Sequence, residues 1–369
     1  MKSDIRLIVV GGGTAGHINA GIALFDEFKK QESKARFLFV GTKRGMEKVL
    51  IPKAGYDINF ISSRGLNRQH PLVFLYSLVL IPVSILQSIK ILLCFKPDVI
   101  IGVGGFASGP FILSSRIFRT AVFLLEQNAV MGFTNKILIN FARKVFSAFP
   151  LDKLYDTNKK KIVQLGNPIR TSIKSVSKKS MDDKLINEPK PFTVFIFGGS
   201  QGARAINRTI VSTISLFNSI SGIKIIHQTG KSDLETVKAA YTDAKFEYQL
   251  SDYIYDIHKT YEDCDLVICR SGASSIFELI ASKSPSLLIP LPTAANDHQL
   301  YNARFLSKRG CAELIEQKNL TPQRLYERIR HYMENRLELK AMYAALDELS
   351  SKTKQNAAEL IVKEIKKNV

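Results

Sequence analysis

Three glycine clusters in the sequence provide the residue type that most often brings a polypeptide backbone close to phosphate. They run from Gly11 to Gly16, from Gly102 to Gly109 and from Gly198 to Gly202, and each follows an apolar run. Glycine permits tight turns and close backbone approach, and a helix that begins after such a turn offers N–H groups to an anion. One cluster would be weak evidence, since many α/β turns are glycine-rich. Three in one chain predict a phosphate-bearing ligand.

The first cluster leads into a histidine, His17, where a helix is expected to begin. At the positive end of a helix dipole an imidazole stays neutral and can accept a proton, so His17 is a candidate general base. The alternative is a histidine that only caps or packs the helix. The spacing Gly11-x-Gly13-x-x-Gly16 also matches the dinucleotide fingerprint GxGxxG, which leaves an NAD(P)-dependent oxidoreductase open. No cluster matches the GxxxxGK[ST] pattern of P-loop proteins.

The run "CRSGASSIFELI", from Cys269 to Ile280, combines a cation, a glycine turn and a helix. Arg270 and the first amides of that helix suit a diphosphate, and Glu278 suits ribose hydroxyls. The alternative for Glu278 is a solvated helix residue. The next run, "PLPTAANDHQLYNAR", gathers amide side chains that suit sugar hydroxyls. No DxD-like acidic pair follows a predicted strand, so we expect neither a metal nor a cofactor.

Alternating apolar strands and helical stretches must position these residues. The first half is predicted to contain the strands Ile5–Val10, Arg36–Val40, Val99–Val103, Ala121–Leu125 and Val163–Leu165. The second half is predicted to contain a strand starting at Phe192 and the strands Ile223–Gln228, Leu266–Cys269 and Ser286–Pro290. The predicted fold class is α/β, with two Rossmann-like doubly wound domains facing a cleft.

The domain boundaries follow from composition. We expect an N-terminal domain at 1–170, a linker rich in Lys and Ser at 171–190, a C-terminal domain at 191–350 and a final amphipathic helix within 351–369.

Charge and cysteine content narrow the class of protein. The net charge of +19 attracts polyanions such as nucleic acid, anionic lipid or phosphorylated substrates, without choosing among them. The four cysteines form no CxxC pair, which is typical of reduced core residues in a cytoplasmic protein. The first apolar run breaks into glycine, which predicts a β-strand and not a signal peptide.

The stretch 71–95 is uncharged from Pro71 to Ile89 and long enough to cross a membrane. We expect that it does not cross one, because Pro82 and several serines interrupt it. A single span would also separate the strands Ile5–Val10 and Val99–Val103, which are both expected in one sheet.

Two alternatives remain for this stretch. It forms one or two buried helices of the first domain, or it exposes apolar residues to a membrane surface. In the second case Arg64, Arg68 and Lys90 would lie near lipid phosphates.

The motifs, taken together, resemble the MurG family of bacterial peptidoglycan glycosyltransferases, in glycosyltransferase family 28. The matching segments are "GVGGFASGP", "EQNAVMGFTNK", "GNPIR", "GGSQGARAIN", "CRSGASSIFEL" and "DHQLYNARFLSKRGCAELI", in order over nearly the whole chain. The resemblance implies a GT-B fold whose first domain takes the acceptor and associates with a membrane. It also implies a second domain that binds UDP-N-acetylglucosamine (UDP-GlcNAc) and a C-terminal helix that returns to the first domain.

The implied reaction is an inverting transfer of N-acetylglucosamine from UDP-GlcNAc to the C4 hydroxyl of the muramoyl sugar of lipid I, giving lipid II and UDP. The implied partners are UDP-GlcNAc, lipid I, an anionic membrane surface and other cell-wall synthesis proteins, with no nucleic acid. The implied location is the cytoplasmic face of the cell membrane, as a peripheral protein. Alternatives are a related transferase acting on diacylglycerol, an NAD(P)-dependent oxidoreductase and a non-catalytic membrane scaffold.

The resemblance also implies roles for individual residues. His17 would be the catalytic base. The donor-binding set would be Thr14, Asn128, Arg170, Ser200, Gln201, Ile254, Arg270, Ser271, Gly272, Glu278, Gln299 and Asn302. The loops for the acceptor diphosphate would contain Gly12, Gly13, Gly16, Gly104, Gly105, Phe106 and Ser108.

Within the donor-binding set the roles differ. Ile254 would meet the uracil through its backbone, Arg270 the nucleotide and diphosphate, and Glu278 the ribose. Ser200 and Gln201 would lie beside the diphosphate, and Gln299 and Asn302 would hold the sugar. Thr14 and Asn128 would also face the acceptor and the reacting centre, with Arg170 at the cleft.

The sequence departs from the family pattern at four positions. In the opening motif Ala15 replaces a glycine and Ala20 a proline. Phe106 replaces a tyrosine, and His298 stands where some members have glutamine. These changes are expected to affect the fit of the acceptor more than the type of reaction.

Overall fold

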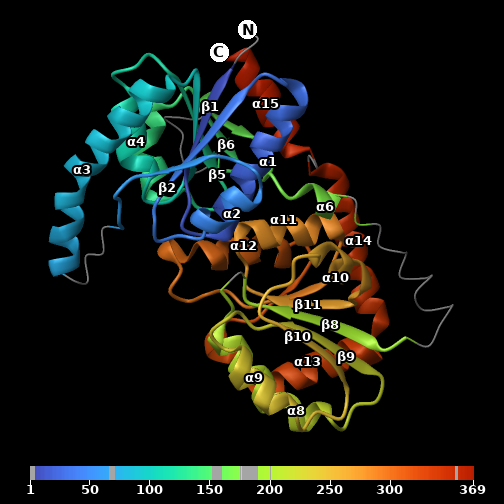
Figure 1. The fold of residues 1–369 in the computed structure, drawn as a ribbon. Helices are drawn as coiled ribbons and strands as arrows, with labels where there is room; N and C mark the ends of the chain where they lie inside the picture. The colour runs from blue at the N-terminus through green and yellow to red at the C-terminus, as the bar shows by residue number, and fades with distance from the viewer. Residues whose placement is uncertain are drawn as a thin grey trace. The chain divides into compact units, whose positions relative to one another are not determined.

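The computed structural model describes residues 5–65, 71–151, 160–174, 176, 190–199, 201–353 and 356–369. These residues form two compact units (Figure 1). Unit 1 contains Met1–Arg170 and Asn356–Val369, and unit 2 contains Thr171–Gln355. Most of the predicted linker 171–190 lies outside the described residues. Its first four residues are not an irregular stretch, because they form helix α6 (Thr171–Lys174), which contacts α10 and α11 of unit 2.

Unit 1 contains a seven-stranded parallel sheet within the described residues, in the order β3-β2-β1-β4-β5-β6-β7. Its strands are β1 (Arg6–Gly11), β2 (Arg36–Gly41), β3 (Ile58–Phe60), β4 (Val99–Gly104), β5 (Ala121–Glu126), β6 (Lys144–Ser147) and β7 (Ile162–Gln164). Its helices are α1 (Ala15–Gln31), α2 (Glu47–Lys53), α3 (Pro71–Phe95), α4 (Ser108–Ser115), α5 (Phe133–Leu138) and α15 (Ala357–Lys367), with a 3₁₀ turn at Ile139–Phe141.

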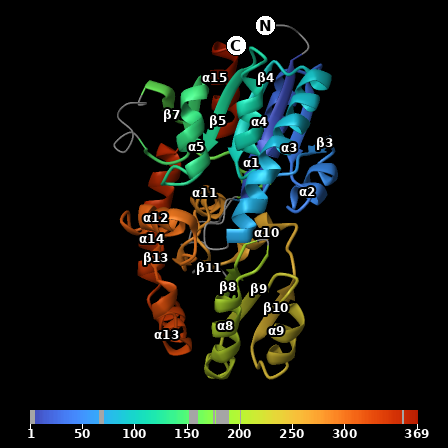
Figure 2. The same ribbon diagram turned by 90° about the vertical axis from the view of Figure 1, so that its left-hand side faces the viewer.

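Unit 2 contains a six-stranded parallel sheet within the residues described there, in the order β10-β9-β8-β11-β12-β13 (Figure 2). Its strands are β8 (Phe192–Phe197), β9 (Ile223–Gln228), β10 (Glu247–Ser251), β11 (Leu266–Cys269), β12 (Ser286–Leu288) and β13 (Glu313–Leu314). Its helices, besides α6, are α8 (Arg204–Phe217), α9 (Leu234–Tyr241), α10 (Ile257–Asp263), α11 (Ala273–Ser282), α12 (His298–Ser307), α13 (Pro322–Glu334) and α14 (Arg336–Lys352), with 3₁₀ turns at Ala295–Asp297 and Gln317–Asn319.

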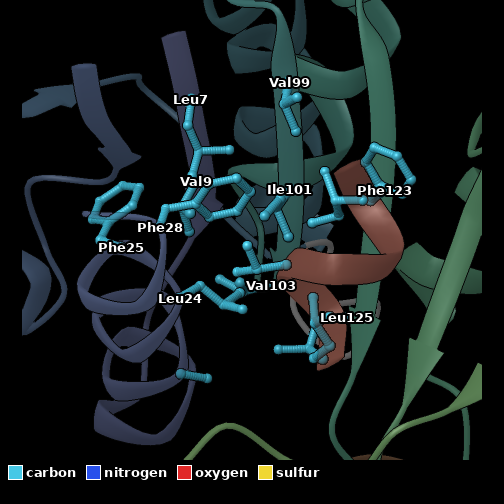
Figure 3. Close-up of a cluster of buried hydrophobic side chains, with 14 of the residues drawn as sticks. Leu7, Val9, Leu24, Phe25, Phe28, Val99, Ile101, Val103, Phe123 and Leu125 are labelled. Carbon is cyan, nitrogen blue, oxygen red and sulfur yellow. The ribbon is translucent and has the colours of Figure 1, made fainter. Parts of the chain in front are cut away.

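Strand β1 shows why the strands of unit 1 are continuous apolar runs. Leu7 and Val9 face one side of the sheet, where they pack with Phe25 of α1 (Figure 3). Ile8 and Val10 face the other side and belong to a second cluster formed with α3 and α4. A strand buried on both faces needs apolar residues at every position, as parallel sheets covered by helices require.

Helix α15 belongs to the core of unit 1, although it is the last helix of the chain. Its residues Ile361, Val362 and Ile365 are fully buried in the cluster formed with α1 and β1. An ion pair between Lys366 and Glu32, 2.7 Å long, joins the ends of α15 and α1.

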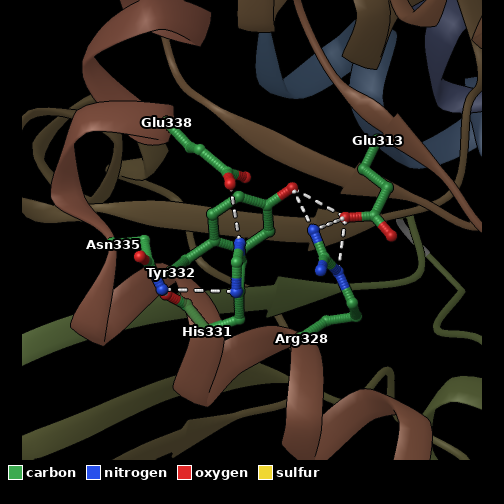
Figure 4. A network of polar contacts seen from close by, with 6 residues as sticks. All are labelled: Glu313, Arg328, His331, Tyr332, Asn335 and Glu338. Carbon is green, nitrogen blue, oxygen red and sulfur yellow. Dashed lines mark hydrogen bonds and ion pairs between the residues drawn. The ribbon is translucent and has the colours of Figure 1, made fainter.

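The last strand of unit 2 is fixed to the following helices by a polar network (Figure 4). The carboxylate of Glu313 in β13 accepts hydrogen bonds from Arg328 at 2.8 Å and Tyr332 at 2.6 Å, both in α13. His331 of α13 lies 2.9 Å from Glu338 of α14.

The predicted α/β fold class with two doubly wound domains is confirmed. Two details differ from the sequence-based expectations. Helix α3 continues through Pro82, which lies on an exposed face and removes one helical hydrogen bond without ending the helix. Cys94 is exposed and is not a core residue, whereas the other three cysteines are buried and free.

The strand orders define where a ligand can bind. In each sheet the chain reverses its winding direction next to its first strand, between β1 and β4 in unit 1 and between β8 and β11 in unit 2. In open α/β sheets a crevice forms at the carboxyl ends of the strands at such a point. All three glycine clusters follow strands at these two points, since they follow β1, β4 and β8.

Candidate active site at the carboxyl edges of the two sheets

Two glycine turns of unit 1 pack backbone against backbone after β1 and β4. Gly11, Gly12 and Gly13 have φ angles of +150°, +134° and +87°, and Gly104 and Gly105 have +97° and +83°. A Cβ atom on Gly11 would lie 2.3 Å from the carbonyl oxygen of Gly104, and one on Gly105 would lie 2.6 Å from that of Gly12. These glycines are therefore required for the two turns to meet, whatever ligand they bind.

Ser108 joins the same two turns from the first position of α4. Its hydroxyl is buried and lies 3.0 Å from the carbonyl oxygen of Val10 and 2.9 Å from that of Gly104. Since a carbonyl oxygen only accepts, the hydroxyl proton of Ser108 is directed into the protein. The hydroxyl group of Ser108 therefore has a structural contact, and the role predicted for Ser108 at the acceptor diphosphate stays a prediction.

His17 lies in the first turn of α1 and reaches across to the second glycine turn. Its Nδ1 is 3.2 Å from the carbonyl oxygen of Gly12 and 3.1 Å from Oγ1 of Thr14. Its Nε2 lies over Gly104, where an added Cβ would be only 3.1 Å away. A proton on Nδ1 would be donated to the carbonyl oxygen of Gly12 and would leave the lone pair of neutral His17 on Nε2, whereas an unprotonated Nδ1 would accept the hydroxyl of Thr14. The structure thus brings Thr14, His17 and Gly104 together.

Sequence reasoning missed Glu47, a fully buried carboxylate below the first glycine turn. Its Oε2 accepts the N–H of Gly13 at 3.1 Å, and its Oε1 accepts the N–H and hydroxyl of Thr42 at 2.9 Å and 3.0 Å. The N–H of Gly13 is therefore directed at Glu47 and not toward a bound phosphate. The signal available in the sequence is the glycine pair at 41 and 45, which leaves room for this side chain.

A second missed carboxylate, Glu126, ends β5 and shapes the loop that carries Asn128. It accepts the N–H of Asn128 at 3.0 Å, the N–H of Gly132 at 2.8 Å and the amide of Asn135 at 2.8 Å. Burial raises the pKa of the Glu126 carboxyl group, and these hydrogen bonds oppose the rise. An acidic residue at the end of an apolar strand was the signal for it.

Three further residues predicted in unit 1 are Gly16, Phe106 and Arg170. Gly16 offers its carbonyl oxygen to Gln127 at 3.4 Å. Phe106 is 61% exposed and lies over Gly65, and its carbonyl oxygen accepts the hydroxyl of Ser63 at 2.7 Å. Arg170 follows β7 and belongs to neither glycine turn.

The glycine turn of unit 2 repeats the backbone packing of unit 1. Gly202 has a φ of +78°, and an added Cβ would lie 2.0 Å from the carbonyl oxygen of Thr229. A Cβ on Gly230 would lie 2.5 Å from the carbonyl oxygen of Gln201. Helix α8 begins after this turn with no side-chain cap. The predicted residue Ser200 lies outside the described residues.

Arg270 is buried and mostly engaged with the protein. Its Nη1 donates to the carbonyl oxygens of Ile289 and Pro290, both at 3.0 Å, and its Nη2 donates to Gln317 at 2.6 Å. Burial lowers the pKa of Arg270 to about 10, so it stays charged at neutral pH. Its contact with a diphosphate stays a prediction. The structure adds a second role, since these bonds hold the residues after β12 against the end of β11.

Three predicted residues gather next to Arg270. The hydroxyl of Ser271 donates to the carbonyl oxygen of Gln299 at 2.7 Å, and the amide of Asn302 donates to the carbonyl oxygen of Ser271 at 3.1 Å. The side-chain oxygen of Gln299 accepts the N–H of Leu291 at 3.0 Å. These bonds join the start of α12 to the turn that precedes α11.

Gly272 is the N-cap residue of α11 and leaves the start of this helix uncovered by a side chain. No side-chain hydrogen bond caps α11, and an added Cβ on Gly272 would meet no described atom within 4 Å. This helix terminus offers N–H groups to an anion.

Glu278 and Ile254 occupy the neighbouring part of unit 2. Glu278 is only 5% exposed and accepts the hydroxyl of Tyr261 at 3.3 Å, so the alternative of a solvated helix residue is wrong. The N–H of Ile254 donates to Gln228 at 2.9 Å, and Gln228 donates to the carbonyl oxygen of Gly199 at 3.0 Å. Sequence reasoning missed Gln228, a buried side chain that joins the predicted uracil segment to the glycine turn.

Two family models match the chain. The model of the glycosyltransferase family 28 N-terminal domain matches residues 7–147, and that of the C-terminal domain matches residues 193–364.

Two curated relatives carry the same name, UDP-N-acetylglucosamine–N-acetylmuramyl-(pentapeptide) pyrophosphoryl-undecaprenol N-acetylglucosamine transferase. The one from Anaeromyxobacter sp. (strain Fw109-5) is 39% identical over 330 residues, 88% of this chain and 84% of the relative. The one from Acetivibrio thermocellus is 36% identical over 366 residues, 99% of each chain.

Two solved structures are also similar to this chain. MurG of Acinetobacter baumannii has a TM-score of 0.76 at 27% identity and covers 98% of this chain and 99% of its own. The UDP-GlcNAc 2-epimerase of Neisseria meningitidis bound to UDP-GlcNAc has a TM-score of 0.67 at 12% identity, covering 98% of this chain and 100% of its own. At that identity the likeness shows the fold alone.

A buried histidine behind the glycine turn of unit 2 predicts a pH dependence of stability. His227 is fully buried, with Nε2 3.1 Å from Oδ1 of Asn207 and Nδ1 3.2 Å from the hydroxyl of Tyr241. Burial lowers the pKa of His227 from 6.5 to about 4. The unfolded chain therefore binds a proton at His227 near pH 6.5, whereas the folded chain binds this proton only near pH 4.

Stability should be fully present above pH 6.5 and fall by about 3 kcal/mol between pH 6.5 and 4 from this group alone. Urea unfolding across this range measures the fall, and a His227→Gln variant should show a smaller one. Equal falls in the two proteins would contradict the burial of a neutral imidazole.

Proposed function

The chain belongs to glycosyltransferase family 28, and we propose that the carboxyl edges of its two sheets hold the two substrates of one glycosyl transfer. The enzyme transfers N-acetylglucosamine from UDP-GlcNAc to the C4 hydroxyl of the muramoyl sugar of lipid I, giving lipid II and UDP. The names of the curated relatives favour this reaction over a diacylglycerol transferase, and the family models favour it over an NAD(P)-dependent oxidoreductase. The assignment of the substrates to the two edges rests on His17. This residue follows the first glycine turn of unit 1 and lies over Gly104 in the second.

The edge of unit 2 is assigned to the donor. The uncapped start of α11 at Gly272 and the charge of Arg270 suit the two phosphates of UDP. Glu278 and the segment at Ile254 lie beside this terminus and suit ribose and uracil. Gln299 and Asn302, joined to Ser271, form the side assigned to the sugar.

The edge of unit 1 is assigned to the acceptor. In a single displacement the C4 hydroxyl oxygen bonds to the anomeric carbon of the donor sugar while the bond from that carbon to UDP breaks. The hydroxyl proton passes to Nε2 of His17, which makes His17 the general base. The charge that develops on UDP is stabilised by the N–H groups of α11 and by Arg270.

Helix α3 supports a peripheral association with a membrane, because three of its serines are buried and several of its apolar residues are exposed. Ser77, Ser84 and Ser88 are buried against the protein. An apolar stripe faces outward, and its members are Leu75, Val79, Leu86 and Leu93, all more than half exposed.

The segment Leu75–Phe95 of α3 has a length and a hydropathy of 2.2 that would admit a membrane span. Only 17% of its most apolar 18-residue stretch is buried inside the protein, so the alternative of a buried core helix is not supported. The strands on either side of α3, β3 and β4, lie in one sheet. We therefore assign α3 to the surface of a bilayer, with Arg64 and Lys90 near anionic lipid. Arg68 lies outside the described residues.

Removing the imidazole of His17 should stop chemistry without affecting the donor. In a His17→Ala variant kcat should fall about 10²- to 10⁴-fold, the usual contribution of a positioned base. The affinity for UDP-GlcNAc, measured by calorimetry, should not change, because the donor edge belongs to unit 2. Near-normal transfer by a variant that binds donor would remove His17 from the role of base.

A methyl group at Gly272 should weaken donor binding without harming the fold. Gly272 has φ −61° and ψ 147°, which any residue adopts, and an added Cβ meets no described atom. Gly272→Ala should therefore fold as stably as the wild type, and should bind UDP-GlcNAc about tenfold more weakly, a loss of about 1.4 kcal/mol.

The matched control is Gly109→Ala in α4 of unit 1, where an added Cβ has ordinary contacts. It should bind the donor normally. Unchanged donor affinity in Gly272→Ala would show that α11 does not receive the diphosphate.

A charge on the apolar stripe of α3 should weaken membrane binding. Leu86→Glu is expected to reduce affinity for vesicles containing anionic phospholipid about tenfold or more, because one buried leucine contributes about 1.5–3 kcal/mol. Sedimentation with vesicles measures this. Leu337→Glu, at an 81% exposed leucine of unit 2, is the control. Equal binding of both variants would argue against α3 as the contact.

A further inference from the structure

Glu47 and His17 contact opposite ends of one peptide group. Oε2 of Glu47 accepts the N–H of Gly13 at 3.1 Å, and Nδ1 of His17 lies 3.2 Å from the carbonyl oxygen of Gly12. The carbonyl group of Gly12 and the N–H of Gly13 belong to the same peptide. Since the peptides of the described chain are trans, these two groups point in opposite directions. A carboxylate, a peptide and an imidazole therefore follow one another in a row.

The position of the Glu47 carboxylate is defined by three glycines from two segments of the chain. A Cβ on Gly12, Gly41 or Gly45 would lie 2.8, 2.6 or 1.8 Å from the nearest atom of the Glu47 side chain. Any side chain at these positions would displace the carboxylate. The absence of side chains at these three positions therefore makes room for the carboxyl group of Glu47.

This carboxyl group is buried among neutral donors. It accepts hydrogen bonds from the N–H of Gly13 and from the N–H and hydroxyl of Thr42. An apolar side chain in the same space would leave the N–H of Gly13 and the N–H and hydroxyl of Thr42 without this acceptor, so the carboxyl group also serves the fold of the turn.

We propose that Glu47 is a positioning residue that acts on His17 through the peptide between Gly12 and Gly13. The inference rests on the proposed role of His17 as base. A carboxylate that accepts a peptide N–H polarises the group, which makes the carbonyl oxygen at its other end a stronger acceptor. The Gly12 carbonyl then holds the proton of His17 on Nδ1 and leaves the lone pair on Nε2, over Gly104. The same polarisation stabilises the imidazolium that forms when Nε2 takes the acceptor proton.

The effect resembles that of a carboxylate bonded directly to a catalytic histidine, which fixes its tautomer and orientation. Here a peptide group stands between the two. The backbone N–H of Thr42 holds the other oxygen, Oε1, and so keeps Oε2 directed at Gly13, while the Thr42 hydroxyl adds a second bond to Oε1.

The test compares Glu47→Gln with the wild type by nitrogen NMR of protein labelled with ¹⁵N in histidine. The His17 signals are identified by their absence in His17→Gln. Wild-type His17 should be mainly protonated on Nδ1, and Glu47→Gln should move the population toward the Nε2-protonated tautomer. In the same variant kcat should fall about 10- to 100-fold, as when metal-bound histidines lose an orienting partner, while KM for UDP-GlcNAc stays the same.

Thr42→Val is the matched control, since it disturbs the same carboxylate but keeps its charge and its bond to Gly13. Its tautomer should resemble that of the wild type. Should Glu47→Gln fail to fold, Gly45→Ala gives the second measurement, because its Cβ displaces Oε2 without removing the charge. It should also raise the Nε2-protonated population.

An unchanged His17 tautomer in a folded Glu47→Gln protein overturns the proposal, even if kcat falls, because a merely structural role predicts that result. Failure of the proposed function is distinguishable. If His17→Ala still transfers sugar, His17 is not the base, whereas the tautomer measurement reports the coupling between Glu47 and His17 independently of activity.

Discussion

The candidate site depends on one steric constraint, the direct contact of two backbone turns at the edge of the first sheet. Parallel pairing places the carboxyl ends of β1 and β4 next to each other, so the turns that follow them must share the same space. They can do so because Gly11 and Gly105 have no Cβ, where one would lie 2.3 Å or 2.6 Å from the opposite carbonyl oxygen. The closeness of the turns is what lets His17, which leaves one turn, reach Gly104 in the other. The glycines are therefore needed for the geometry before any ligand is considered.

In unit 2 a glycine turn also packs backbone against backbone after the first strand of the sheet, but the side chains near this turn differ from those of unit 1. Gly202 and Gly230 again allow backbone to approach backbone, and a buried amide, Gln228, connects the turn to the segment at Ile254. Where unit 1 has an imidazole, unit 2 has a buried guanidinium and an uncapped helix start at Gly272. A proton acceptor and an anion site are the two requirements of a displacement with a diphosphate leaving group. The two units share the scaffold, and each carries one of these two groups at the carboxyl edge of its sheet.

The sequence predicted those features that local pattern determines. Apolar runs followed by glycine located the strands and turns, and the position of His17 in the first turn of α1 followed from the end of the glycine run. The contacts of Glu47 with Gly13 and of Gln228 with Ile254 could not be found in this way, because these residues are 34 and 26 positions apart and only the folded chain brings them together. Helix α3 shows another limit. A stretch that is apolar on every side gives no periodicity, so the sequence could not tell that its serines face the protein. The buried bonds of Arg270 were equally invisible, since their acceptors are two backbone carbonyl groups of another strand end and the distant side chain of Gln317.

The departures of the opening motif from its family can be judged in the same physical terms. Ala15 replaces a glycine, which would be strained at positive φ, but it is the first residue of α1 and has the backbone of a helix. Ala20 replaces a proline, lies fully buried in the core, and as alanine favours the helix interior where it stands. Gly12 and Gly13, whose φ is positive and which the family pattern contains, are retained. The chain has thus changed the two positions that belong to the helix and kept those that form the turn. The constraint that brings His17 to Gly104 is therefore intact, and the substitutions act on the helix behind it.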